Sequence, residues 1–430
     1  MELLLGTAKR DITPEYPIAL AGYSGRKGAM EGVNLPIFLR IALFGQESER
    51  GLHKQLVASA DIIWWGNERM EPLRSKLAER FGLRKEDVIL AASHSHSGPQ
   101  TTAKLPLVGQ MDENYVRSLE EKLYEGVEVA QANMEPVTAE LGRGHCSVGV
   151  NRRKIVDGRA LFEPNPAGPH DDEVTVVRFR KAGGEPKALF VHYTCHPTVT
   201  NANKLSAEFS GFAMAEIERQ LGGDAVSLFL QGCCGDIRPA LVRDGQFYAG
   251  NESDVKELGG RLAEAVGSVL AEPLHPLAAR RLNGGHAACE LPFQSVPPRE
   301  RLEELVALDD KRVSDWAGQL LDDGALLREA VPLELVRLDI AEGLSLLSMN
   351  AEMVADYGLY VKVASAGAVL PVAYSNGMIG YVPTAEQLVE GGYEAIDSHY
   401  YFGLCSPFTA SCEAIIKKTV DDMLAGSRSE

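Results

Sequence analysis

Two histidines follow a short run of apolar residues in the first quarter of the chain. Residues 88–99 read Val-Ile-Leu-Ala-Ala-Ser-His-Ser-His-Ser-Gly-Pro, a pattern typical of a buried strand that stops at a Gly-Pro break. In extended backbone, residues two apart share one face, so we expect His94 and His96 to project to the same side of the strand end. Neutral imidazoles so arranged bind one metal ion, or divide into one ligand and one acid/base. The alternative is a pair of hydrogen-bonded histidines near a turn.

A second apolar run ends in the same way. Residues 188–198 read Ala-Leu-Phe-Val-His-Tyr-Thr-Cys-His-Pro-Thr, and Pro197 stops the strand just after His196. His196 is therefore a candidate ligand at a strand end, whereas His192 lies among aromatic and apolar residues and is expected in the core. Cys195 is not expected to act as a nucleophile, because adjacent strand residues face opposite sides and no Cys-His family signature surrounds it.

A third strand-to-turn break carries charged side chains. Residues 228–239 include Gly235, Asp236 and Arg238 in a tight bend. Small residues let the backbone approach a ligand closely, and Asp236 could orient a metal-bound histidine through a hydrogen bond. The alternative is a structural turn whose arginine faces solvent.

Several common catalytic motifs are absent from the sequence. There is no G-x-S-x-G elbow, no GxxxxGK[ST] loop, no strand followed by G-x-G-x-x-G and no H-E-x-x-H helix. With 43 Lys and Arg against 60 Asp and Glu, the net charge is −17, which disfavours nucleic acids and anionic membrane surfaces as partners. The expected partner is a small-molecule substrate.

The cysteines and the apolar runs of the sequence indicate the cellular compartment of the protein. The seven cysteines are an odd number and include the neighbours Cys233 and Cys234, so we expect reduced thiols. Cys405 and Cys412 stand too far apart for a zinc knuckle. No apolar run approaches the roughly 18 residues of a membrane span, and the N-terminal segment lacks a secretory pattern. We therefore expect a cytoplasmic protein, and the oligomeric state stays open.

The elements that would hold these residues alternate between strand and helix patterns. This alternation is typical of an α/β protein with a large sheet flanked by helices. Strands are predicted over residues 54–63, 87–93, 174–179, 187–193 and 226–231, and helices over 66–81, 115–130, 209–221 and 411–424.

Residues 273–345 differ in character from the rest. They contain Pro-rich turns, a charged helical stretch over 298–323 and an alternating strand over 333–340. We interpret them as an insertion or sub-lobe within one catalytic domain that spans residues 1–430.

A series of short motifs, in a fixed order along the chain, resembles the neutral/alkaline (non-lysosomal) ceramidase family, zinc amidases that cleave the N-acyl bond of ceramide. In chain order the motifs are Ala8-Lys-Arg-Asp-Ile-Thr-Pro, Ala21-Gly-Tyr, Ala58-Ser-Ala-Asp-Ile, Ser93-His-Ser-His-Ser-Gly-Pro, Asn151-Arg152, Asp172-Glu-Val-Thr-Val-Val-Arg-Phe, His196-Pro197, Gly235-Asp-Ile-Arg-Pro, Asn350-Ala-Glu352-Met, Ser375-Asn, Gly380-Tyr381-Val-Pro-Thr and Gly392-Tyr393-Glu-Ala. The resemblance covers essentially the whole catalytic domain. It implies the large mixed sheet of that domain, without the C-terminal immunoglobulin-like domain of other members.

The resemblance also implies one zinc ion per chain. Carried over position by position, the implied ligands are His94, His196, Glu352 and Tyr381. The implied reaction is metal-assisted hydrolysis, in which His96 shuttles protons, Tyr393 donates to the leaving group or oxyanion, and Arg152 holds a substrate oxygen. Asp61 and Asp236 are expected to fix imidazole tautomers.

One departure from the family pattern bears on the substrate. The family motif G-D-V-S-P carries a serine that contacts the amide, and Arg238 stands in its place as a site residue here. A bulky, permanently charged guanidinium favours an anionic or polyhydroxylated substrate over an uncharged lipid headgroup. The leading interpretation is a zinc-dependent hydrolase of an N-acyl (amide) bond with a polar, non-ceramide substrate. The alternatives are an esterase or deacylase of acylated carbohydrates, and a metal- or ligand-binding protein without turnover.

Overall fold

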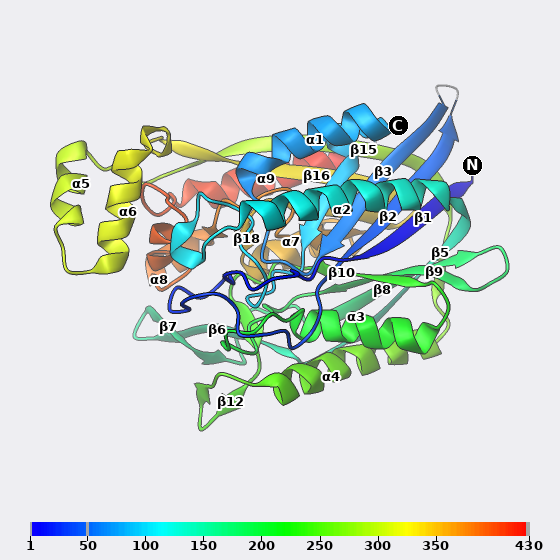
Figure 1. Cartoon of the computed structure of the whole chain (residues 1–430), viewed down its shortest axis with the longest axis horizontal. Coiled ribbons are helices and arrows are strands. Elements are labelled where there is room, and N and C mark those ends of the chain that lie inside the picture. The colour runs from blue at the N-terminus through cyan, green and yellow to red at the C-terminus, as the bar shows by residue number, and fades with distance from the viewer. Residues whose placement is uncertain (1, 49–50, 427–430) are drawn as a thin grey trace.

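A nine-stranded mixed sheet runs through the centre of the protein (Figure 1). The computed structural model describes residues 2–48 and 51–426. In spatial order the strands are β10 (Val226–Gln231), β9 (Pro186–Tyr193), β8 (Glu173–Lys181), β5 (Glu135–His145), β1 (Leu3–Asp11), β2 (Phe38–Ser48), β3 (Gly51–Ala60) and β4 (Val88–Ala92), and β14 (His275–Leu277) pairs with β5. The outermost pairs, β10 with β9 and β3 with β4, are parallel, and the pairs between them are antiparallel. The expected large mixed sheet is confirmed.

A second, four-stranded sheet packs against one face of the central sheet. Its strands are β15 (Ala279–Pro292), β16 (Ala330–Ala341), β17 (Leu344–Met349) and β19 (Val369–Val372). Phe44 and Phe179 of the central sheet share a buried cluster with Val336 and Leu338 of β16. Because side chains alternate between faces along a strand, Leu43 points the other way and joins the larger cluster beneath the helices.

Helices cover the outer faces of both sheets (Figure 1). The helices α2 (Glu113–Ala132), α3 (Glu208–Leu221) and α4 (Glu252–Ala271) pack on the central sheet, and α7 (Ala355–Ala364) and α9 (Ser411–Ala425) pack on the second sheet. Helix α1 (Asn67–Phe81) connects β3 to β4, as a crossover between parallel strands requires. The layers confirm the expected α/β class. Within residues 2–48 and 51–426, none of the helices combines the length and the apolar character that crossing a membrane demands.

The charged helical stretch expected over residues 298–323 is divided into two helices. It forms α5 (Arg299–Val306) and α6 (Lys311–Asp322), which stand together at one end of the molecule (Figure 1). A new helix begins here because the Asp310 carboxylate accepts hydrogen bonds from the backbone N–H groups of Arg312 and Val313.

The rest of residues 273–345 contributes strands to both sheets. β14 extends the central sheet, while β15 and β16 pair in the second. Only α5 and α6 bury a cluster of their own, around Leu302 and Trp316. The interpretation of this segment as an insertion within a single domain over 1–430 stays a prediction.

Short strand pairs bring distant parts of the chain to the carboxyl ends of β4 and β9. β18 (Glu352–Met353) pairs in parallel with β20 (Tyr381–Val382), which makes Glu352 and Tyr381 direct register partners. β11 (Ile237–Pro239) pairs with β6 (Gly149–Val156), and β6 pairs with β7 (Arg159–Asn165). These pairs surround the loops that carry His94 and His196.

Candidate metal centre

Three histidines converge where β4 and β9 end. The potential ligand atoms of His94, His96 and His196 all lie within 4.8 Å of one another. Nε2 of His96 lies 3.0 Å from Nε2 of His94, and the rings of His94 and His196 have centroids 4.9 Å apart. His94 and His196 are fully buried, whereas His96 is partly exposed. The structure therefore brings together the strand-end histidines that the sequence singles out.

Backbone carbonyl groups hold the opposite edge of each ring. Each Nδ1 atom lies within hydrogen-bond distance of a carbonyl oxygen, that of Ile63 for His94 at 2.8 Å, Gly22 for His96 at 3.0 Å and Ile237 for His196 at 2.9 Å. A carbonyl oxygen only accepts, so each Nδ1 carries the proton and each Nε2 presents a lone pair. Lone pairs that face one another at 3.0 Å repel unless a cation lies between them. The donor set therefore fits a bound metal ion.

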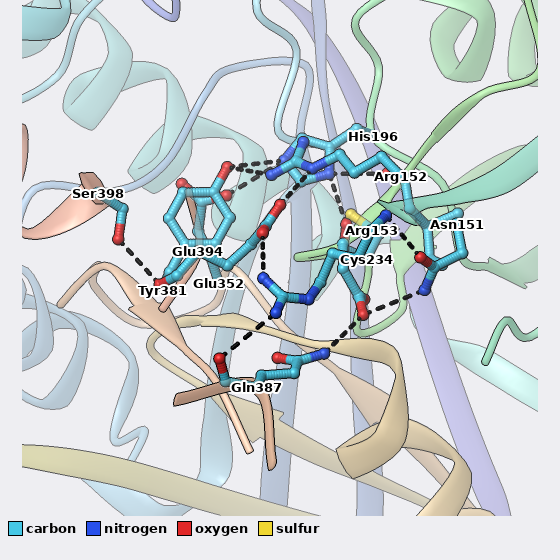
Figure 2. A network of polar contacts seen from close by, with 12 residues as sticks. Asn151, Arg152, Arg153, His196, Cys234, Glu352, Tyr381, Gln387, Glu394 and Ser398 are labelled. Carbon is cyan, nitrogen blue, oxygen red and sulfur yellow. Dashed lines mark hydrogen bonds and ion pairs between the residues drawn. The ribbon is translucent and has the colours of Figure 1, made fainter. Parts of the chain in front are cut away.

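A carboxylate and a phenol complete the cluster (Figure 2). Oε2 of Glu352 lies 3.1 Å from Nε2 of His196 and 3.3 Å from Nε2 of His94. The Tyr381 hydroxyl lies 3.3 Å from Nε2 of His196. All four implied ligands thus meet, with His96 beside them. Their division into four ligands and one proton carrier stays a prediction.

Burial and neighbouring charges set the protonation of these groups. Burial lowers the pKa of His196 to about 4. Burial, together with the nearby His94 and His196, also lowers the pKa of His96 well below its usual value. Burial alone would raise the pKa of Glu352, but the adjacent His94 and His196 hold it well below its usual range. Neutral imidazoles and an ionised carboxylate are the forms that bind metal ions.

The sequence predicts extended backbone at His94, but the structure shows a different conformation. β4 ends at Ala92, and His94 has a φ of 66°, in the left-handed region. The expectation of strand alternation is therefore wrong, and His94 meets His96 through a turn. This conformation is strained for a residue with a side chain, and it persists because the ring is held at Ile63 and stacks on Tyr374 with centroids 4.1 Å apart.

Two glycines allow the backbone to pass close to the centre. A Cβ atom at Gly22, whose φ is 99°, would lie 2.7 Å from the His96 ring. A Cβ atom at Gly235 would lie 3.0 Å from the carbonyl oxygen of Glu352. A larger residue at either position would displace the loop or strand that it touches.

A buried ion network lies behind the metal-binding atoms (Figure 2). Nε of Arg152 donates to Glu394 at 2.6 Å, and Nη2 of Arg152 donates to the Tyr381 hydroxyl at 3.2 Å. Nη1 of Arg153 donates to the second oxygen of Glu394 at 2.8 Å. Glu394 thus balances two buried guanidinium groups and holds Arg152 against Tyr381. Sequence reasoning missed Glu394, although two adjacent arginines in a strand signal the need for a counter-charge.

Aromatic residues lie beside the clustered side chains. The Tyr393 ring lies 5.4 Å from the Tyr381 ring, and the guanidinium carbon of Arg152 lies 5.7 Å from the Tyr393 centroid. The Tyr23 ring stands edge-on to His96 with centroids 5.3 Å apart. Tyr393 therefore lies beside Tyr381 and Arg152, and its role as a donor stays a prediction. Tyr23, for which the sequence predicts no role, lies beside His96.

Arg238 lies beside the centre and not in open solvent. Its side chain is half-buried, and its guanidinium carbon lies 4.4 Å from the Phe247 centroid and 5.5 Å from the Phe162 centroid. The role of Arg238 as a site residue stays a prediction.

The carboxylates of Asp61 and Asp236 contact no imidazole in the described part of the chain, contrary to expectation. Asp61 accepts from Arg40 at 2.9 Å. Asp236 accepts from the Ala355 backbone N–H at 2.8 Å and from Gln387 at 3.0 Å, and burial raises its pKa to about 6. Backbone carbonyl groups orient the rings instead, because the loops turn their peptide groups toward the imidazoles.

Two further residues lie where the sequence predicts. His192 is buried within β9, and its Nε2 donates to the Pro371 carbonyl at 2.8 Å. Cys195 is fully buried, and burial raises the pKa of its thiol well above the usual value, which argues against a nucleophilic role. All seven cysteines are free.

Comparison with known proteins points to one family. The family model described as neutral/alkaline non-lysosomal ceramidase, N-terminal, matches residues 3–257. The neutral ceramidase of Pseudomonas aeruginosa is 26% identical over 295 residues, which are 64% of this chain and 43% of that protein. The neutral ceramidase of Mycobacterium tuberculosis is 26% identical over 262 residues, which are 55% of this chain and 40% of that protein. The matches therefore span less than half the length of either relative.

Solved structures share the fold. The crystal structure of the neutral ceramidase from Pseudomonas aeruginosa superposes with a TM-score of 0.75 at 20% identity, covering 100% of this chain and 75% of that one. A ceramidase complexed with C2 gives a TM-score of 0.75 at 19% identity, with the same coverage. With the family model matched over more than half of its residues, this chain belongs to the neutral/alkaline non-lysosomal ceramidase family.

Proposed function

We propose that the protein is a zinc-dependent hydrolase that cleaves an N-acyl (amide) bond in a polar or anionic substrate other than ceramide. The observation that carries the proposal is the convergence of His94, His196, Glu352 and Tyr381, with the imidazole lone pairs turned toward one another. Imidazole nitrogen and carboxylate oxygen are ligands that zinc prefers. The names of the two relatives, both neutral ceramidases, support the amide as the bond class.

In this proposal the four residues hold one zinc ion per chain, which when bound supplies Lewis acidity at an acyl carbonyl and lowers the pKa of water. His96 keeps its Nδ1 proton on the Gly22 carbonyl, so its Nε2 can take a proton from water and return it to the leaving amine. Arg152, oriented by Glu394, holds a substrate oxygen. Burial raises the pKa of Tyr393, which keeps its hydroxyl protonated as a donor to the leaving group or oxyanion.

The test combines metal content with turnover. Protein purified without added metal should contain about one zinc ion per chain, and it should hydrolyse an N-acyl amino acid or N-acyl sugar faster than a short-chain ceramide. His94→Ala and Glu352→Ala should remove metal and activity together. Substoichiometric metal that Glu352→Ala leaves unchanged would contradict the proposal.

Two other functions use the same centre. An esterase or deacylase of acylated carbohydrates is supported because the same carbonyl attack cleaves esters, and it would hydrolyse an O-acyl sugar faster than the matching N-acyl sugar. A ligand-binding protein is supported by the charged Arg238 beside the centre, and it would hold metal without turning over any of these compounds.

A further inference from the structure

The guanidinium of Arg238 has a charge that the described residues do not balance. No carboxylate among residues 2–48 and 51–426 forms an ion pair with it, and its buried Nε atom has no hydrogen-bond partner there. Its contacts are the rings of Phe247 and Phe162, at 4.4 and 5.5 Å. Aromatic rings stabilise a cation but leave its N–H groups without an oxygen acceptor.

Arg152, in contrast to Arg238, has a carboxylate partner. Both guanidinium carbons lie near the same Phe162 ring, that of Arg152 at 5.1 Å and that of Arg238 at 5.5 Å. Arg152 is matched by Glu394 at 2.6 Å, whereas Arg238 faces Phe247. Burial lowers the pKa of Arg238, and the positive charge of Arg152 lowers it further. An anion at Arg238 would relieve both effects.

The position of Arg238 ties it to the metal centre. It directly follows Ile237, whose carbonyl oxygen holds Nδ1 of His196 at 2.9 Å. Its charge acts on the Tyr23 phenol, whose ring stands 5.3 Å from His96. A substrate group that reaches Arg238 therefore lies close to the atoms proposed to carry out hydrolysis.

Tyr23 and Arg26 supply further hydrogen-bond donors near Arg238. Burial raises the pKa of Tyr23, so its hydroxyl stays protonated. That hydroxyl has no hydrogen-bond partner among the residues that the structure describes. The guanidinium carbon of Arg26 lies 4.9 Å from the Tyr23 centroid, and within residues 2–48 and 51–426 Arg26 donates only to the carbonyl groups of Ala21, His96 and Ala202. Arg238, Arg26 and Arg152 thus all act on the Tyr23 phenol, and the nearby Glu208 carboxylate offsets their charge in part.

We propose that Arg238 binds an anionic group, a carboxylate or a phosphate, on the substrate of this protein, with the Tyr23 hydroxyl as a second donor. This inference rests on the proposed amide hydrolysis and defines its substrate class. A guanidinium presents a planar fork of donors that matches either anion. Phe162 and Phe247 hold the fork in place, which reduces the entropy lost when the anion binds.

The experiment compares probes that differ only in charge, with zinc-loaded protein. N-octanoylglycine and N-octanoyl-O-phosphoethanolamine carry the anion, and N-octanoylglycinamide and N-octanoylethanolamine are their neutral partners. We expect a preference for at least one anionic probe of about 10- to 100-fold in kcat/KM and in Kd by calorimetry, the range of a charge-assisted hydrogen bond. The probe that shows the preference identifies the anion as carboxylate or phosphate.

Arg238→Ser should abolish that preference while zinc content stays unchanged. Arg238→Lys should retain part of it, because the charge remains and the fork is lost. Arg243→Ser is the matched control, since Arg243 also lies over an aromatic ring, that of Tyr248 at 4.7 Å, but is exposed to solvent. It should leave the preference intact.

The outcomes separate this inference from the proposed function. Turnover of all four probes without an anion preference, or a preference that survives Arg238→Ser, would overturn the role of Arg238 and leave amide hydrolysis standing. An affinity preference that Arg238→Ser removes, without turnover of any probe, would support the anion site and contradict the hydrolase. Equal loss of the preference in Arg243→Ser would reduce the effect to general surface charge.

Discussion

Two buried histidines on the same stretch of chain, His192 and His196, stand in opposite environments. Around His192 the charges are balanced within the protein, because Lys362 pairs with Asp171 at 2.7 Å and with Glu173 at 3.0 Å, and Nε2 of His192 donates to a carbonyl. Around His196, Nε2 faces the Glu352 carboxylate at 3.1 Å, and the nearby Arg152 donates to Tyr381 and Glu394.

The difference shows how a candidate metal site can be distinguished from a polar core. Both regions exclude water and both lower the pKa of a histidine to about 4. A low histidine pKa therefore does not distinguish them. The direction of the ring does: His192 turns Nε2 to an acceptor, whereas His196 turns Nδ1 to an acceptor and leaves Nε2 facing Glu352.

The strongest test of the comparison exchanges one histidine in each region. His196→Ala should remove the metal and lower amide hydrolysis on the order of a thousandfold, because several kcal/mol of Lewis-acid stabilisation are lost. His192→Gln, which keeps a donor for the Pro371 carbonyl, should retain full metal content. Elemental analysis and kcat measure both. Equal metal loss in the two variants would mean that ring direction does not distinguish a metal ligand from a core histidine.

A second test asks whether the ion network of Arg152, Arg153 and Glu394 depends on charge balance, as the region around His192 does. Glu394→Gln leaves the buried Arg152 and Arg153 without their shared carboxylate, and we expect a loss of about 3–5 kcal/mol in the free energy of unfolding. Glu390→Gln removes only a more exposed partner of Arg153 and should cost less than about 1 kcal/mol. Urea denaturation gives both values. Similar losses in the two variants would mean that burial does not set the strength of these pairs.

A third test uses a buried carboxylate that forms no ion pair within the described part of the chain, although Arg26 lies near enough to act on it. Glu208 accepts from Ser97 at 3.2 Å and from the backbone N–H groups of Val199 and Thr200, next to both histidine loops. Burial raises its pKa from 4.5 to about 7. The folded state therefore binds the proton more tightly, and this stabilisation is lost as pH rises through that window, by about 3 kcal/mol in total.

Relative to Glu208→Gln, the native protein should thus lose stability between about pH 4.5 and 7. Glu218 provides the opposite sign: burial would raise its pKa, but Arg40 and Lys9 lower it, so its contribution is lost as pH falls. Relative to its own Gln variant, the native protein should lose the Glu208 contribution as pH rises from about 4.5 to 7, and it should lose the Glu218 contribution as pH falls below about 4.5. Urea unfolding of Glu208→Gln and Glu218→Gln, measured in both pH ranges, should therefore give slopes of opposite direction. Slopes of the same direction would contradict the assignment of Glu208.

Sequence reasoning could predict the strands and the residues that gather at their ends, because apolar runs and His, Gly and Pro breaks are local signals. The resemblance supplied Glu352 and Tyr381, which local patterns would have left as a surface carboxylate and a packed aromatic. Their meeting depends on the β18–β20 pair, a contact between segments far apart in sequence. Local patterns carry no information about such pairing.

Other features of the site also lay beyond local patterns. The left-handed backbone of His94 arises from contacts with Ile63 and Tyr374, which only the assembled fold provides. The same holds for the carbonyl groups that take the role expected of Asp61 and Asp236, since a peptide carbonyl has no signature in a sequence. The break between α5 and α6 was readable in principle from the capping residue Asp310.

The smallest expected effect comes from a test of how closely the backbone at Gly22 packs against the His96 ring. Gly22 and Gly28 both have left-handed φ angles, of 99° and 75°, so alanine at either strains the backbone by about 1–2 kcal/mol. Only at Gly22 would the new Cβ meet the His96 ring, at 2.7 Å, while nothing lies within 4 Å at Gly28. Gly22→Ala should therefore lower kcat about tenfold beyond any change in Gly28→Ala, because His96, the proposed general base, would lose its alignment with the substrate. Equal activity of the two variants at matched metal content would mean that the position of His96 does not limit turnover.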